Sequence, residues 1–289
     1  MFIEVLVPGS CGEIARGWKD GQPFMISCPI GLYSRVIVTD RTSAKTGFQK
    51  KAELALKITT SYMGFESFPL GMALESQLPT GKGMAASTAD IVAVIQGVAT
   101  AIEEELDPEE VAELAAGIEP TDGIFYPGIA NMNYMTGALN KTYEDVPKMI
   151  IAMFDFGGKV NSIKLFSDYH GHEDSPAELM EAITALDSGL TPEKIARVST
   201  LSALENQKIL EKPQLEEIIE YVKSLGALGV NVAHSGTMMG VLFAPDFSMI
   251  KVNEAVKAIS AKFPHLEYFE TERMISGGCS VKQRSGSGL

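Results

Sequence analysis

Apolar and polar positions alternate along the first sixty residues, and glycine and proline interrupt the pattern repeatedly. Alternation with a period of two, bounded by such residues, is typical of strands with one buried face. It predicts strands at residues 2–7, 24–30 and 33–39. A further stretch, 53–62, alternates around Leu54, Leu56 and Ile58, and we predict a fourth strand there.

The period changes after Pro79. Apolar residues now recur at spacings of three and four, which predicts one long helix over 85–105; they are Ile91, Val94, Ile95, Val98 and Ile102. Asp107 and Pro108 then precede two glutamates. An N-cap residue, a proline in the first turn and early acidic residues are signals of a helix start, so a short second helix should reach about residue 116.

The second half begins with a buried-type strand at 149–154. Helical stretches follow at 175–187, 191–211 and 213–225, then strands at 230–234 and 238–244, a helix at 247–263 and two terminal strands. The interpretation is an α+β protein in two parts, 1–145 and 146–289. The small, polar tail 284–289 is expected to be disordered.

Charge and cysteine content restrict the partners and the compartment. The 289 residues carry a formal charge of −13, which disfavours nucleic acid and anionic lipid as partners. Neither a signal-peptide pattern nor an apolar run long enough for a bilayer is visible. Three cysteines without CxxC spacing argue against a disulfide framework or a zinc site, so a reducing cytoplasm is expected.

A glycine-rich segment directly precedes the long predicted helix. Its glycines allow close approach of a ligand, and a helix N-terminus attracts anions through unpaired N–H groups. A lysine and two hydroxyl residues add donors for phosphate or Mg²⁺. The spacing fits neither GxxxxGK[ST] nor GxGxxG, and a plain glycine-rich turn is the alternative. The expected ATP-binding residues are Pro79, Thr80, Gly81, Lys82, Gly83, Met84, Ala85, Ala86, Ser87 and Thr88.

This segment resembles the second motif of the GHMP kinases, Pro-x-x-x-Gly-Leu-Gly-Ser-Ser-Ala. Met84 stands at the leucine, Ala86 at the first serine and Ser87 at the second. Residues 7–13 resemble the first motif of that family, and residues 229–240 resemble the third. Three motifs in order imply the GHMP kinase fold: an N-terminal part like ribosomal protein S5 domain 2 and a ferredoxin-like C-terminal α/β sandwich, with the active site between them.

The segments at 10–13, 81–84, 119–128, 203–207 and 232–237 together resemble those of the L-threonine kinases of cobalamin biosynthesis. The resemblance implies phosphorylation of L-threonine to L-threonine O-3-phosphate with ATP and Mg²⁺. Two alternatives remain: a GHMP kinase for another alcohol such as homoserine, and a non-catalytic nucleotide-binding regulator. A homodimer is compatible with the sequence.

The resemblance also assigns roles at the site. Asp122 is the expected general base, although an Asx-turn before Gly123 is an alternative. Ser87 and Glu119 are expected to hold Mg²⁺, and Lys82 and Ser87 to act with Asp122 in catalysis. Glu13 could bind a substrate ammonium or form an ion pair with Arg16. The other expected substrate contacts are Ser10, His234, Ser235, Gly236 and Thr237.

Overall fold

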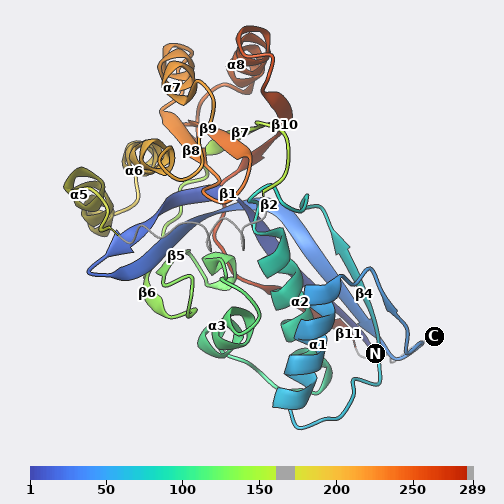
Figure 1. Ribbon diagram of the computed structural model, residues 1–289. Coiled ribbons are helices and arrows are strands. Elements are labelled where there is room, and N and C mark those ends of the chain that lie inside the picture. Colours follow the sequence, from blue (N-terminus) through green and yellow to red (C-terminus); the bar gives the residue numbers. More distant parts are fainter. Residues whose placement is uncertain (161–172, 285–289) are drawn as a thin grey trace.

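A long β-hairpin runs through the middle of the molecule (Figure 1). The computed structural model describes residues 1–160 and 173–284. The hairpin consists of β1 (Phe2–Lys19) and β2 (Gln22–Thr39), which pair antiparallel. The predicted strands at 2–7, 24–30 and 33–39 are therefore pieces of two longer ones. Pro8 and Gly9 do not end β1, because a register shift between them lets the pairing continue.

All strands belong to one mixed sheet. Its main path runs β10-β7-β9-β8-β1-β2-β4-β3, while β11 pairs with β1, and β5 links β2 to β6. The additional strands are β3 (Lys45–Thr46), β4 (Gly71–Ser76), β5 (Ile129–Met132), β6 (Leu139–Tyr143), β7 (Ile150–Asp155), β8 (Gly229–Val232), β9 (Met238–Phe243), β10 (Glu267–Arg273) and β11 (Ser280–Arg284). Helices and strands are mixed throughout, which confirms the α+β class.

The prediction of a strand at 53–62 is wrong, because this segment lies within helix α1 (Lys50–Tyr62). Its large apolar residues do alternate, but they do not define the buried face: Leu54 is 42 % exposed. The buried face consists instead of small residues at helical spacing, Ala52, Ala55 and Thr59. These allow α1 to pack closely on α2.

Helix α2 (Ala86–Ala101) lies between α1 and the hairpin and is buried on almost every side. Helix α3 (Pro108–Ala116) follows, and Asp107 and Glu110 form the reciprocal hydrogen bonds of a capping box at its start. Both predicted helices are confirmed, although α2 ends at 101 rather than 105. A short 3₁₀ turn, η1 (Gly123–Phe125), then carries the chain back toward the hairpin.

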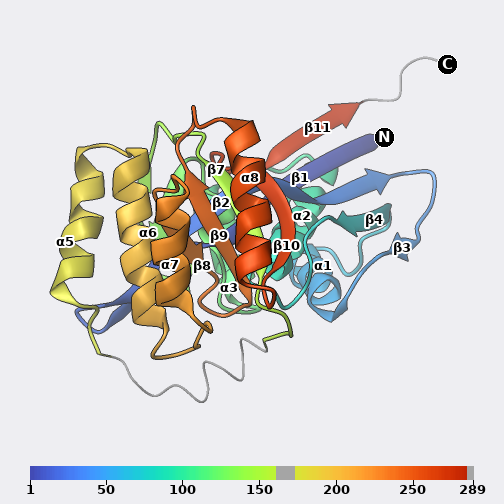
Figure 2. The same cartoon turned by 90° about the horizontal axis from the view of Figure 1, so that it is seen from above.

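The second half places its helices on one face of strands β7 to β10. Figure 2 shows them side by side above the sheet. They are α5 (Ala177–Ala185), α6 (Pro192–Asn206), α7 (Leu215–Ser224) and α8 (Met249–Lys262), with a 3₁₀ turn, η2 (Leu186–Ser188), after α5. Every helix predicted here is present, with ends shifted by a few residues.

The last described strand, β11, returns to the N-terminal half and pairs with the outer end of β1. Arg284 was expected to begin a disordered tail, but it belongs to β11; the rest of that prediction, 285–289, lies outside the described residues. Among residues 1–160 and 173–284, no helix has the length and apolar character required to cross a bilayer.

Candidate functional site

A cleft of about 1030 Å³ opens beside the N-termini of α1 and α2 and the middle of the hairpin. It is lined by most of the predicted site residues, namely Glu13, Pro79, Thr80, Gly81, Gly83, Met84, Ala85, Ala86, Ser87, Thr88, Glu119, Asp122 and Ser235. The predicted residues that do not line it are Ser10, Lys82, His234, Gly236 and Thr237. Sequence positions more than two hundred residues apart therefore meet at one place.

The loop before α2 has the backbone of an anion-binding turn. Gly81 and Gly83 have φ values of 77° and 80°, which residues with a side chain rarely adopt. Ala85 is also left-handed, with φ of 56°, although it is not glycine. No side chain caps the N-terminus of α2. The first N–H groups of this buried helix are therefore left for a ligand in the cleft.

The first and third sequence motifs hold this loop from two sides. From the first, the Ser10 N–H donates to the Met84 carbonyl over 3.1 Å, and the Gly12 N–H donates to the Gly83 carbonyl over 3.2 Å. From the third, the Thr237 N–H donates to the Lys82 carbonyl over 2.9 Å. The third motif thus contacts the loop before α2, and Ser10 and Thr237 act here through their backbones.

Glycine is required where these loops touch. A Cβ on Gly83 would lie 2.3 Å from the Ala233 Cβ, and a Cβ on Gly236 would lie 2.2 Å from the Lys82 carbonyl oxygen. Contacts this short cannot be relieved without moving backbone. The two glycines therefore allow the phosphate loop and the third-motif loop to pack together.

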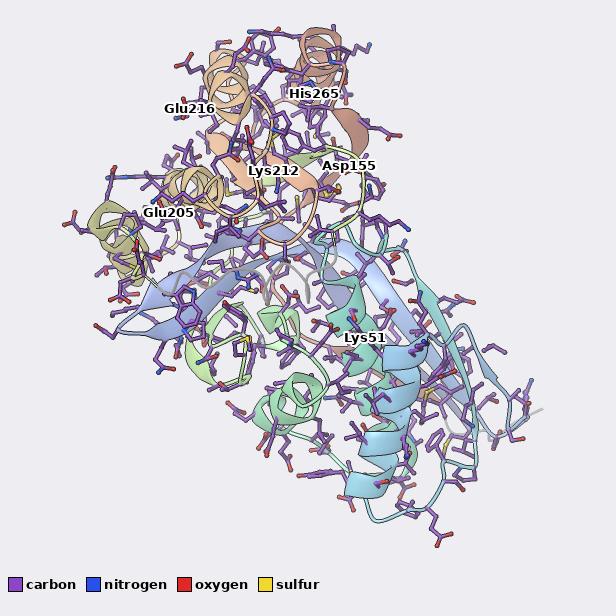
Figure 3. All side chains as sticks on the ribbon, viewed as in Figure 1. Lys51, Asp155, Glu205, Lys212, Glu216 and His265 are labelled. Carbon is purple, nitrogen blue, oxygen red and sulfur yellow. The ribbon has the colours of Figure 1, made fainter. Side chains whose placement is uncertain are left out.

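Lys82 does not line the cleft. Its ammonium forms an ion pair with Asp155 at the end of β7 and donates to the Gly158 carbonyl over 2.7 Å. Although partial burial acts in the opposite direction, this lysine and other donors hold the pKa of Asp155 below its ordinary value. In this structure Lys82 therefore ties the phosphate loop to the C-terminal half. Figure 3 marks Asp155 there.

Ser87, Glu119 and Lys51 form a polar cluster at the start of α2. One Glu119 oxygen accepts a hydrogen bond from the Ser87 hydroxyl, and the other pairs with the Lys51 ammonium. Figure 3 shows Lys51 at the end of α1 that faces the C-terminal half. Within the described parts of the chain, no three His, Cys, Asp or Glu residues gather as metal ligands. A hydroxyl beside one carboxylate fits Mg²⁺, which takes its remaining ligands from phosphates and water.

Asp122 lies directly before η1, beside the first turn of α2. Its carboxylate is 3.4 Å from the Thr88 hydroxyl, and its own N–H donates to the same hydroxyl over 3.3 Å. Burial, together with the charges of Glu13 and Glu119, raises the pKa of Asp122 from 3.8 to about 7. A carboxyl group with that pKa can exchange a proton near neutral pH.

Glu13 is held from behind by the third motif. It is 4 % exposed, and its Oε2 accepts from the His234 N–H over 2.8 Å and lies 3.1 Å from His234 Nδ1. The other ring nitrogen of His234 lies 2.9 Å from the Ser202 hydroxyl on α6. Burial opposes the ionisation of Glu13. The hydrogen bonds that His234 donates, together with the positive charge of Arg16, nevertheless hold the pKa of Glu13 below its ordinary value.

Sequence reasoning missed several residues that the cleft brings in. Lys50 and Lys51 were missed because a strand was predicted at 53–62. They line the cleft because they begin helix α1. Lys159 lines the cleft beside Gly81, and no sequence motif indicates it. Arg16 was considered only as a partner for Glu13. Asp155 ends a buried strand, and a carboxylate at that position was the one available signal.

Comparison with known proteins agrees with this geometry. A family model described as GHMP kinases N terminal domain matches residues 49–131, and one described as GHMP kinases C terminal matches residues 175–262. The chain is 26 % identical to an L-threonine kinase of Citrobacter freundii over 95 % of this chain and 98 % of the relative.

Solved structures show the same fold. The mevalonate kinase of Methanococcus jannaschii has a TM-score of 0.69 at 16 % identity, with 95 % of this chain and 98 % of that chain covered. The homoserine kinase of Cytophaga hutchinsonii has a TM-score of 0.68 at 13 % identity, with 97 % of each chain covered. At such identities the likeness concerns the fold.

The two family models together match more than half of the chain, and they meet across the cleft. The loop before α2 is part of the first match, and His234, which holds Glu13, belongs to the second. This family has the fold that the sequence predicts, and membership of a kinase family implies the use of ATP. The chain belongs to the GHMP kinases and is a phosphotransferase with an alcohol group as acceptor.

Proposed function

We propose that this enzyme transfers the γ-phosphoryl group of ATP to the side-chain hydroxyl of L-threonine. The product is L-threonine O-3-phosphate, a precursor for cobalamin biosynthesis, and the reaction takes place in the cytoplasm. The observation that carries the proposal is Asp122, a carboxyl group with a pKa of about 7 that lines the cleft beside Thr88 in the first turn of α2. The name of the Citrobacter relative supports threonine as the acceptor.

In this proposal Asp122 accepts the hydroxyl proton while the hydroxyl oxygen attacks the γ-phosphorus. The proton moves to the Asp122 carboxylate, the bond to the β–γ bridging oxygen breaks, and ADP leaves. Thr88 fixes the Asp122 carboxylate through its hydroxyl. Glu13, which stays ionised and lines the cleft, binds the substrate ammonium.

The loop 79–88 binds the phosphates through the N-terminus of α2. Ser87 and Glu119 would hold Mg²⁺, which offsets the negative charge that develops on the transferred group. Lys51, the ion-pair partner of Glu119, adds a second positive charge beside this position. In this proposal the protein acts mainly by positioning the reactants and by stabilising charge.

The test is an ADP-release assay with Mg²⁺·ATP and five acceptors: L-threonine, L-serine, L-homoserine, mevalonate and galactose. We expect turnover on L-threonine. Loss of a general base lowers rates about 10²–10⁴-fold, so Asp122→Ala should lower the rate of ADP release by a factor in that range. Ser87→Ala should also lower this rate. Asp187→Ala removes a carboxylate that is 50 % exposed in a surface ion pair, and it serves as the matched control.

Two outcomes would contradict the proposal. Turnover of another alcohol but not threonine would refute the substrate and leave the kinase site in place. Full activity of Asp122→Ala on threonine would refute the role of Asp122 as the base.

A further inference from the structure

We propose that Arg16 binds the carboxylate of the amino-acid substrate and thereby makes the enzyme selective for α-amino acids over other alcohols. This inference rests on the proposed function. An α-amino acid with a side-chain hydroxyl presents an ammonium, a carboxylate and a hydroxyl. Glu13 and Asp122 account for the first and the last, so the cleft also needs a cation placed near both.

Arg16 has that position because β1 is irregular at this point. Residues three apart on a regular strand point to opposite faces of the sheet. Register shifts in the pairing of β1 with β2 occur between Ser10 and Glu13 and between Glu13 and Ala15. A bulge redirects the side chains that follow it. Glu13 and Arg16 accordingly both line the cleft.

The guanidinium of Arg16 is held in a fixed orientation. Its carbon lies 4.0 Å from the centre of the Tyr134 ring, and both side chains line the cleft although Arg16 is only 9 % exposed. A cation over an aromatic face is attracted to the ring. The N–H groups of a guanidinium also match a carboxylate in two-point geometry.

One network fixes the strand positions of both charged residues. The Arg16 N–H donates to the Ser202 hydroxyl over 3.1 Å, and the same hydroxyl lies 2.9 Å from His234 Nε2. His234 in turn holds Glu13. Helix α6 therefore sets the spacing between the proposed ammonium site and the proposed carboxylate site.

Arg16 also lies within electrostatic reach of the other two groups. Its charge lowers the pKa of both Glu13 and Asp122, in each case against the effect of burial. In this proposal the substrate ammonium lies at Glu13 and the substrate carboxylate lies at Arg16, so each charge of the amino acid meets an opposite charge. His234 is one of the predicted substrate contacts, but its ring nitrogens face Glu13 and Ser202.

The experiment compares L-threonine with L-threonine amide, which keeps the ammonium and hydroxyl but replaces the carboxylate with a neutral group. Steady-state kinetics are measured for the wild type, Arg16→Met and Arg16→Lys. A buried charge-assisted contact of this kind supports a loss of about 100-fold, so Arg16→Met should lower kcat/KM for threonine by that factor, mainly through KM. For the amide the change should stay within about threefold, and Arg16→Lys should be intermediate because it keeps the charge without the fork.

Arg197→Met is the matched control, since Arg197 is 64 % exposed on α6 and should leave both substrates unchanged. ATP binding and the melting temperature report whether each variant is folded. If Arg16→Met lowers kcat/KM equally for L-threonine and its amide, or still prefers L-threonine to the amide as the wild type does, the carboxylate role of Arg16 is refuted. The proposed function would then still stand. If the wild type does not turn over threonine at all, both proposals fail together.

Discussion

Replacement of Asp122 by asparagine should abolish catalysis and stabilise the protein at the same time. Asparagine keeps the shape of the side chain and removes its charge. The carboxyl group is costly to ionise because it is buried and faces the charges of Glu13 and Glu119, which Arg16 and Thr88 only partly offset. Asparagine does not incur this cost.

The magnitude follows from the pKa of Asp122. Burial and neighbouring carboxylates raise it from 3.8 to about 7 in the folded state. Between those pH values the folded protein keeps a proton that the unfolded chain has released, so stability falls as pH rises and the full cost is present above about pH 7. At ~1.4 kcal/mol per pKa unit, the ceiling is about 4 kcal/mol. Since the side chain stays partly open to the cleft, we expect Asp122→Asn to gain about 2 kcal/mol at pH 8.

Urea unfolding of the wild type and Asp122→Asn at about pH 5.5 and pH 8 tests this linkage. The gain should be larger at pH 8, and the same variant should lose phosphotransfer. Asp187→Asn, at an exposed site, should show neither effect. A gain that is the same at both pH values, or a less stable variant at pH 8, would refute the electrostatic reasoning.

Three other substitutions test separate features. Lys212 is 2 % exposed in the loop between α6 and α7 (Figure 3), and burial lowers its pKa from 10.5 to about 8, so its charge costs stability below about pH 8. Lys212→Met should gain about 1–3 kcal/mol at pH 7 and little above pH 10 in urea unfolding; no gain at pH 7 would contradict this. Gly83→Ala should destabilise the protein by about 2–3 kcal/mol and weaken ATP binding, because the added Cβ meets Ala233. Gly21 has a similar φ but open space around it, so Gly21→Ala should destabilise by only about 1 kcal/mol. Equal losses of stability in thermal unfolding would refute the packing argument. Glu13→Gln should move the acidic limb of the kcat/KM pH profile to lower pH, since the Glu13 charge helps raise the pKa of Asp122; an unmoved limb would separate the two residues.

The sequence predicted best where one local pattern decides the structure. Apolar residues of helix α2 recur at spacings of three and four, and its glycine-rich start has φ values that glycine favours, so both were visible in the sequence. Helix α1 was missed because its buried residues are Ala52, Ala55 and Thr59. Their helical spacing is weak beside the alternating leucines, and only contact with α2 selects it.

The site was predictable in its parts and much less in its connections. The first-motif, second-motif and third-motif residues were all located, but their pairing depends on a register that no single segment contains. Lys82, which is expected at the phosphates, pairs with Asp155, a residue 73 positions away. Glu13 also contacts His234, a partner that the sequence did not indicate. Long-range hydrogen bonds of this kind follow from tertiary packing rather than from local preference.

The position of β11 has a consequence for folding during synthesis. The outer half of β1 is flanked by β2 on one side and by β11 on the other, and the two segments are separated by most of the chain. At about 5–20 residues per second, a ribosome completes β11 roughly 15–60 s after β1. During that interval one edge of β1 has no native partner, so a nascent chain exposes hydrogen-bonding groups that a chaperone or another chain can reach.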